Sequence, residues 1–285
     1  MKKKKNFLSR NILFPKGRMY SHALTIILSV FIIYIFSMSA QITEKKTIKN
    51  QGDTLEFSGY HWVTKESFGK HTGPGRNYFS GSKENVWVDS LGKLHLRLTF
   101  RNDKWFCPEV RLIDGLGYGR YYFHVDPLPQ QLDKDVVIGL FVYDLEDTSN
   151  FHKEIDIEFS QWGQDTLMNS QYVVQPNEEE AFRFNTDFNQ PTKHMIELRK
   201  QKIAFKSIYT AIDKDDIPLE ITRHKIKPDY NYHTSNERAI INVWLYRTSE
   251  PANLKEFEVV ISKFEFKKFR WIENVFGRNT NKIKP

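Results

Sequence analysis

The segment HKEIDIEF at residues 152–159 places three carboxylic acids, Glu154, Asp156 and Glu158, at alternate positions. Side chains on a β-strand alternate between its two faces, so a strand here turns all three acids to one face and the intervening isoleucines to the other. The pattern predicts a β-strand with one face on a hydrophobic core and an acidic face opposite.

The acidic face has a specific electrostatic consequence. Three neighbouring like charges repel, so at least one of the carboxyls is expected to have a raised pKa. Retaining glycoside hydrolysis needs two carboxyls in different protonation states, about 5–5.5 Å apart. The backbones of Glu154 and Glu158 are four strand residues apart, roughly 13 Å at ~3.3 Å per residue. Their side chains must therefore lean toward each other, as on a concave sheet, while Asp156 between them helps to separate the two pKa values.

A second interpretation of the same segment needs no chemistry. Alternating acids and isoleucines are also typical of a half-exposed strand whose carboxylates are neutralised by Lys or Arg on neighbouring strands. Because short motifs match by chance, the surrounding sequence has to decide between the two interpretations.

The motif and its surroundings resemble glycoside hydrolase family 16, whose members carry E-[ILV]-D-[IVF]-E on one strand. EIDIEF is similar to the lichenase and xyloglucan-transglycosylase branches, without the extra residue of the laminarinase branch. Three further segments fit the family in order: EVRLIDGLGYGRYYFHV at 109–125, INVWL at 241–245 and EFEVVISKFEF at 256–266. The resemblance spans about residues 55–269 and implies an all-β, concanavalin-like jelly-roll sandwich of two antiparallel sheets.

The resemblance also implies roles for individual residues. Glu154 would be the nucleophile, Asp156 the assisting carboxylate and Glu158 the general acid/base. Trp244 and Asn242 would line the sugar-binding cleft.

Further substrate-binding residues are expected from the chemistry of sugars. Glycans present apolar C–H faces that stack on aromatic rings, and their hydroxyls need amide and carboxylate partners. Aromatic residues make up 14% of the chain, and Trp162 closely follows the motif. The remaining candidates are Arg76 and Asn77, in the turn GPGRN at 73–77, and Gln171 and Gln175.

Two departures from the family pattern leave the glycan open. The segment after the motif, residues 160–176, does not read like the usual lichenase continuation, and Leu198 stands where many members have Trp. No His/Cys cluster has zinc spacing, so we expect no catalytic metal and no cofactor. A structural calcium ion, common in relatives of this fold, stays an open alternative. The DKDD run at 213–216 has Pro218 where an EF-hand needs Gly, and is predicted to be a solvated loop.

The charge distribution excludes a nucleic-acid binder. The formal net charge is +7, and seven Lys and Arg residues precede the first acid, Glu44, so the rest of the chain is neutral. A nucleic-acid-binding domain needs a basic face on its folded part.

Residues 23–36, ALTIILSVFIIYIF, follow this basic stretch and lead to the small residues Ser37, Ser39 and Ala40. This order predicts a secretory signal peptide cleaved next to Ala40. Residues 22–40 approach the ~20 needed to span a bilayer, so an uncleaved anchor is the alternative. We expect export in both cases, to a secreted, periplasmic or membrane-anchored location.

We expect one folded domain. Residues 1–40 are expected to be the export segment, 41–52 a linker, 53–272 one β-sandwich and 273–285 a polar tail. The single cysteine, Cys107, allows no internal disulfide and is expected to be a small buried hydrophobe. Besides the motif, short β-rich runs separated by turn residues predict strands at 93–100, 119–125, 136–144, 170–174, 194–200 and 202–209.

The sequence thus predicts a retaining endo-hydrolase of a β-linked, glucan-like polysaccharide. Two alternatives are a transglycosylase of the same family and a non-catalytic glycan-binding sandwich. We expect a monomer that meets a membrane only through an uncleaved N-terminal segment.

Overall fold

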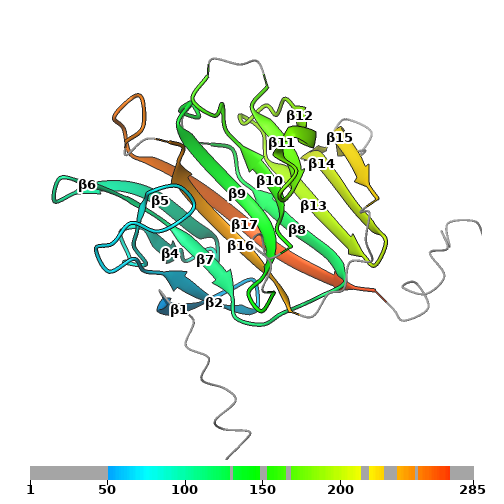
Figure 1. Cartoon of the computed structure of the whole chain (residues 1–285), viewed down its shortest axis with the longest axis horizontal. Helices are drawn as coiled ribbons and strands as arrows, with labels where there is room; N and C mark the ends of the chain where they lie inside the picture. Colours follow the sequence, from blue (N-terminus) through cyan, green and yellow to red (C-terminus); the bar gives the residue numbers. More distant parts are fainter. Residues whose placement is uncertain are drawn as a thin grey trace, which may run out of the picture. The chain divides into compact units, whose positions relative to one another are not determined.

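The computed structural model describes residues 51–128, 131–147, 153–164, 168–212, 218–227, 236–247 and 250–269. Two large β-sheets make up this part of the chain (Figure 1). Apart from the 3₁₀ turn η1 (Glu178–Glu180), the described residues contain no helix, and none is therefore long and apolar enough to cross a membrane. The predicted all-β jelly-roll sandwich is confirmed.

The first sheet carries the acidic motif and is called the site sheet here. Its eight described strands lie in the spatial order β1 (Gln51–Phe57), β2 (Tyr60–Lys65), β7 (Glu109–Leu112), β16 (Glu237–Leu245), β9 (Val136–Asp144), β10 (Ile155–Phe159), β11 (Ser170–Val174) and β12 (Phe182–Phe184). All neighbouring pairs in it are antiparallel.

The second sheet, called the back sheet, is built from the remaining strands. Their order is β15 (Pro218–Ile226), β14 (Lys202–Ile212), β13 (Thr192–Arg199), β8 (Gly119–Val125), β17 (Phe257–Lys268), β5 (Leu94–Arg101), β6 (Lys104–Cys107) and β3 (Tyr78–Phe79), with β4 (Val86–Val88) beside β5. The short pair β3 and β6 is parallel, a small departure from the predicted antiparallel pairing.

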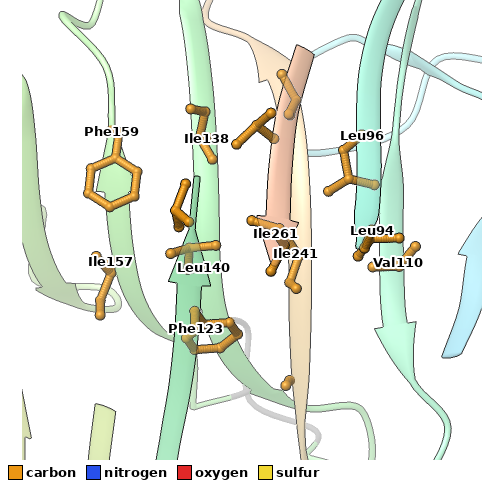
Figure 2. Close-up of a cluster of buried hydrophobic side chains, with 14 of the residues drawn as sticks. Leu94, Leu96, Val110, Phe123, Ile138, Leu140, Ile157, Phe159, Ile241 and Ile261 are labelled. Carbon is orange, nitrogen blue, oxygen red and sulfur yellow. The ribbon is translucent and has the colours of Figure 1, made fainter. Parts of the chain in front are cut away.

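The core lies between the facing sides of the two sheets (Figure 2). The predicted apolar face of β5 is confirmed, because Leu94, Leu96 and Leu98 are all fully buried. From the site sheet the core receives the alternate residues Ile138, Leu140, Ile157, Phe159 and Ile241, and from the back sheet it receives Phe123 and Ile261.

The motif strand β10 lies between β9 and β11 and follows the predicted alternation. Ile155, Ile157 and Phe159 are at most 1% exposed and belong to the core cluster. The intervening acids therefore face away from the core, on the outer side of the site sheet. The burial of the apolar residues fixes the register, since a slip by one residue would move every acid into the core.

Truncation of the motif strand's core face should destabilise the protein strongly. Ile157→Ala removes buried methyl groups and leaves a cavity, so we expect the free energy of unfolding to fall by about 2–5 kcal/mol. Urea unfolding measures this change. Leu219→Ala, at a side chain on β15 that is 60% exposed, is the matched control and should change stability by less than about 0.5 kcal/mol.

Several smaller expectations can be placed in the structure. Cys107 is buried as predicted, and the GPGRN segment forms a turn flanked by a bridge between Thr72 and Asn77. The predicted export segment at 1–40, the DKDD run at 213–216 and the polar tail at 273–285 lie outside the described residues.

Candidate active site

A cavity of about 590 Å³ lies on the outer face of the site sheet. Its volume is in the range of small-molecule and substrate sites. Glu154, Asp156 and Glu158 all line it. The three acids that alternate along the sequence therefore face one cavity. The register partners of two of them on the adjacent strands are not basic: Glu158 lies between Gln171 and Gly139, and Asp156 between Val173 and Phe141.

A row of polar residues crosses the site sheet at right angles to its strands. Each member is the register partner of the next, and the row runs Arg183, Gln171, Glu158, Gly139, Asn242, Glu109 from β12 to β7. The row brings residues that lie more than 130 positions apart in the sequence, from Glu109 to Asn242, into one line across the cavity.

Gly139 is required at its place in this row. A Cβ atom there would lie 2.5 Å from Oδ1 of Asn242, closer than side chains tolerate. Because it has no side chain, Gly139 gives the Asn242 amide room between β9 and β16. Glu158 and Asn242 lie on either side of Gly139, which lines the cavity without placing a side chain in it.

Two side-chain amides hold carboxylates of this row in place. Nε2 of Gln171 donates a hydrogen bond of 2.6 Å to Oε2 of Glu158. Nδ2 of Asn242 donates one of 3.3 Å to Oε2 of Glu109. The carbonyl oxygens of both amides are buried and have no hydrogen-bond partner among the described residues. They are acceptors available to hydroxyl groups.

Asp156 is the most buried acid of the motif, at 2% exposure. Burial raises the pKa of Asp156 well above its usual value, and the negative charges of Glu154 and Glu158 raise it further. Its side chain is hydrogen-bonded to Glu154 and Gln175. A protonated Asp156 can donate to Glu154, which favours the ionised form of Glu154.

This raised pKa predicts a stability difference that depends on pH. Below the unfolded-state pKa of about 3.9 both states of the protein are protonated at Asp156. As the pH rises, the unfolded chain releases its proton first, so the native state loses relative stability until the pH passes the folded-state pKa. Asp156→Asn keeps a donor and cannot ionise. The free energy of unfolding of Asp156→Asn minus that of the wild type should increase by about 1 kcal/mol or more from pH 4 to pH 7. Urea unfolding of both proteins measures this difference. A constant difference across this range would contradict a protonated Asp156.

Local contacts at the start of β10 set the position of Glu154. The preceding residue, Lys153, has a positive φ of 55°, and its ammonium lies 2.9 Å from a carboxylate oxygen of Asp147. The backbone carbonyl of Glu154 accepts a hydrogen bond from the amide of Gln175. Burial raises the pKa of Tyr143 to about 12, and the charge of Glu154 adds to the shift. The tyrosine therefore keeps its phenolic proton on the cavity wall.

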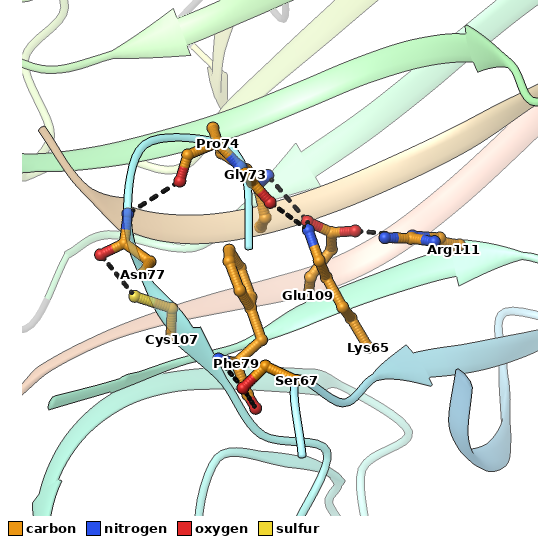
Figure 3. Close-up of polar contacts among 10 residues, drawn as sticks. Lys65, Ser67, Gly73, Pro74, Asn77, Phe79, Cys107, Glu109 and Arg111 are labelled. Carbon is orange, nitrogen blue, oxygen red and sulfur yellow. Dashed lines mark hydrogen bonds and ion pairs between the residues drawn. The ribbon is translucent and has the colours of Figure 1, made fainter. Parts of the chain in front are cut away.

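A buried ionic cluster surrounds Glu109, the last residue of the polar row (Figure 3). The ammonium of Lys65 is 3.1 Å from Glu109, and it also donates to the carbonyl of Gly73. Nε of Arg111 is 2.6 Å from the second oxygen of Glu109. Burial alone would raise the pKa of Glu109, but the charges of Lys65 and Arg111 outweigh it and the pKa lies below its usual value. Glu109 is therefore ionised.

Two tryptophans predicted as sugar platforms, Trp162 and Trp244, also line the cavity. Trp162 sits in a tight turn at φ 46°, where its amide donates to Oγ of Ser160. The guanidinium of Arg183 lies 4.6 Å from the Trp162 ring centre. The ring of Trp244 is 6.2 Å from that of Tyr246, which also lines the cavity.

Arg76 and Asn77 lie outside the cavity that contains the acids. Asn77 is buried, and its amide donates to the carbonyls of Pro74 and Leu245, so it ties the turn to the end of β16. Arg76 is exposed and lines a separate cavity of about 130 Å³. Their turn nevertheless borders the cavity through Gly73, Pro74 and Gly75, so a contact of this pair with sugar hydroxyls stays a prediction.

The other predicted residues come together. Glu154, Asp156, Glu158, Gln171, Gln175, Asn242, Trp162 and Trp244 share the cavity. Sequence reasoning assigned no site role to several further lining residues, namely Lys65, Glu109, Arg111, Gly139, Tyr143, Arg183 and Tyr246. Among the residues that the structure describes, no group of three or more His, Cys, Asp or Glu is placed to hold a metal ion.

Comparison with solved structures defines the class of fold. The Bacillus licheniformis β-glucanase is similar with a TM-score of 0.56 and 19% identity, over 76% of this chain and 99% of that one. A β-1,3-1,4-glucanase (lichenase) from a mouse hindgut metagenome follows at 0.53 and 18%, over 73% and 93%. A family 16 glycoside hydrolase of the Bacteroides ovatus mixed-linkage glucan PUL, in complex with a product, gives 0.53 and 11%, over 72% and 94%. No family model and no curated protein matches the chain. The fold is the jelly roll of these β-glucanases.

Proposed function

We propose that this protein is a retaining endo-glycoside hydrolase of the family 16 type that cleaves a β-linked, glucan-like polysaccharide. The observation that carries the proposal is the convergence of three alternate acids in a single substrate-sized cavity: Glu154, immediately before β10, and Asp156 and Glu158 on it. Their surroundings differ, since Asp156 is buried and favours its protonated form. Glycoside hydrolysis requires such a separation of protonation states among neighbouring carboxyls.

The first step breaks the glycosidic bond. The carboxylate of Glu154 attacks the anomeric carbon while Glu158 gives its proton to the departing oxygen. A glycosyl ester of Glu154 forms, and the leaving sugar departs as a neutral alcohol. Asp156 contributes through its hydrogen bond to Glu154, and the Gln171 amide holds Glu158 in place through its 2.6 Å bond.

The second step releases the sugar and restores the enzyme. The carboxylate of Glu158 takes a proton from water as the water oxygen attacks the anomeric carbon; the ester bond to Glu154 breaks and Glu154 leaves as a carboxylate. Two displacements on opposite faces leave the anomeric configuration unchanged. The side chains of the cavity supply every proton transfer in this scheme.

The remaining lining residues suit a sugar ligand. The buried carbonyl oxygens of Gln171 and Asn242, which have no partner in the described part of the chain, can accept hydrogen bonds from sugar hydroxyls. Trp162 and Trp244 offer aromatic surface for the apolar faces of sugar rings. The fold likeness to β-glucanases supports a glucan-like backbone.

Incubation with a panel of polysaccharides tests the proposal. Laminarin, lichenan, xyloglucan, agarose and carrageenan are treated with the purified protein, and new reducing ends are measured. We expect new ends from at least one β-linked member, and none from any member with Glu154→Gln. Transfer to an added acceptor oligosaccharide in preference to water would indicate a transglycosylase. Binding without any new reducing ends would leave a non-catalytic glycan-binding sandwich.

A further inference from the structure

We propose that the polysaccharide is acidic, with carboxylate or sulfate groups on the sugars that flank the cleaved bond. This inference rests on the proposed function and names the class of its substrate. It comes from the cations of the cavity, which stand on both sides of the motif strand.

The first cationic region is the Lys65, Glu109 and Arg111 cluster. Two cations share one carboxylate there, with contacts of 3.1 and 2.6 Å. The cluster keeps one positive charge in excess.

The second cationic region is Arg183 on β12, at the opposite end of the polar row. Its side chain is exposed and lines the cavity. Over the described ranges it forms no hydrogen bond or ion pair, and its contact is the ring of Trp162 at 4.6 Å. Trp162, which the turn holds in place, thus positions the guanidinium of Arg183 two strands away from Glu158.

Among the described residues, four acids and three basic residues line the cavity, so the sign of its net charge depends on which acids carry a proton. Asp156 favours its protonated form, and Glu158 must carry a proton before the first step. Glu154 and Glu109 then stand as two carboxylates against the cations of Lys65, Arg111 and Arg183. A neutral glycan can accept hydrogen bonds from these cations, but it has no charge that a net positive charge would neutralise. A guanidinium fork matches the paired oxygens of a carboxylate or sulfate.

A binding experiment on the inactive Glu154→Gln protein tests the proposal without turnover. The probes are lichenan and laminarin, each as the native glucan and as carboxymethyl, sulfate and neutral hydroxyethyl derivatives of equal substitution. Calorimetric titration at low salt should show at least about tenfold tighter binding of one acidic derivative than of the hydroxyethyl control. The gain should shrink in about 0.5 M salt, where the Debye length falls to a few ångströms.

A second variant assigns the effect to Arg183. In the same background, Arg183→Gln should lose about three- to tenfold of the affinity for the acidic derivative, and a clearly smaller share of the affinity for the neutral derivative. Arg223→Gln is the matched control, since Arg223 is exposed on the back sheet and pairs with Glu220. The derivative with the larger loss identifies the group, carboxylate or sulfate.

Equal binding of the neutral and acidic derivatives, or an unchanged affinity in Arg183→Gln, would overturn the acidic substrate. In that case, wild-type cleavage of any neutral panel member keeps the hydrolase proposal intact. Conversely, tight Arg183-dependent binding of an acidic derivative supports the charged subsite even if the wild type cleaves nothing, and then only the hydrolase proposal fails.

Discussion

Glu154→Gln should reduce turnover by at least about 10³-fold while leaving the free energy of unfolding nearly unchanged. Glutamine is almost isosteric with glutamate but has no carboxylate to attack the anomeric carbon. The side chain faces the cavity and is not part of the packed core, so the fold should tolerate the change. Release of reducing ends and urea unfolding, measured on the same preparation, separate the two effects.

Glu56→Gln is a suitable control for this substitution. Glu56 is an exposed acid on β1 of the same sheet, and its replacement should alter neither activity nor stability. Full activity in Glu154→Gln would remove Glu154 from the role of nucleophile. A loss of activity accompanied by unfolding would leave the role undecided, and Glu154→Asp, which retains the carboxylate at a shorter reach, would then be compared with it.

Glu158→Gln should show a loss that depends on the leaving group. Turnover of polysaccharide is expected to fall by about 10²–10⁴-fold, because the departing sugar oxygen needs a proton. An aryl glycoside whose phenol leaves without protonation should react at nearly the wild-type rate in the first step and then accumulate as the glycosyl enzyme. Added azide, which attacks without general-base help, should restore turnover of this substrate. The measurements are the burst of released phenol and the steady-state rate with and without azide.

The same substrate pair distinguishes the two glutamates. Glu154→Gln should lose activity on both substrates. Because no glycosyl ester can form at residue 154, azide has no such intermediate to attack and should not restore turnover by that route. An equal loss on both substrates in Glu158→Gln would contradict its assignment as general acid/base.

The strands with strong local patterns could be predicted from the sequence. β8, β9 and β11 coincide residue for residue with the predicted runs at 119–125, 136–144 and 170–174. Alternate apolar residues of these strands, such as Ile138 and Leu140, lie in the core, so burial itself contributes the pattern, while Phe141 lies on the opposite face and lines the cavity. β1 and β15 were not predicted. Their residues are mostly exposed or half-buried at the edges of the sheets, where the core imposes no alternation.

The acidic face was predictable for the same reason. Ile155 and Ile157 have to be buried, and this alone determines where Glu154, Asp156 and Glu158 point. The raised pKa of Asp156 also followed from like-charge crowding, although burial is its larger cause and could not be read from the sequence.

The rest of the cavity depends on pairing between distant strands. Gly139 and Glu109 reach the row through the register of β9, β16 and β7, and no local pattern encodes that register. The E-x-R segment that contains Glu109 and Arg111 was the one signal available for the ionic cluster. The sequence also could not show that the amide of Asn77 donates to two backbone carbonyls, because one of these, Leu245, is 168 residues away in the sequence.

The stereochemistry of the first product tests the central claim most directly. Proton NMR of the reaction mixture, recorded within the first turnovers and before mutarotation, resolves the α and β anomers of the new reducing end. Two displacements through Glu154 and Glu158 predict that the β anomer forms first and that the α anomer follows as the sugar equilibrates. Initial formation of the α anomer would mean direct attack by water, and it would contradict the assignment of Glu154 as a nucleophile.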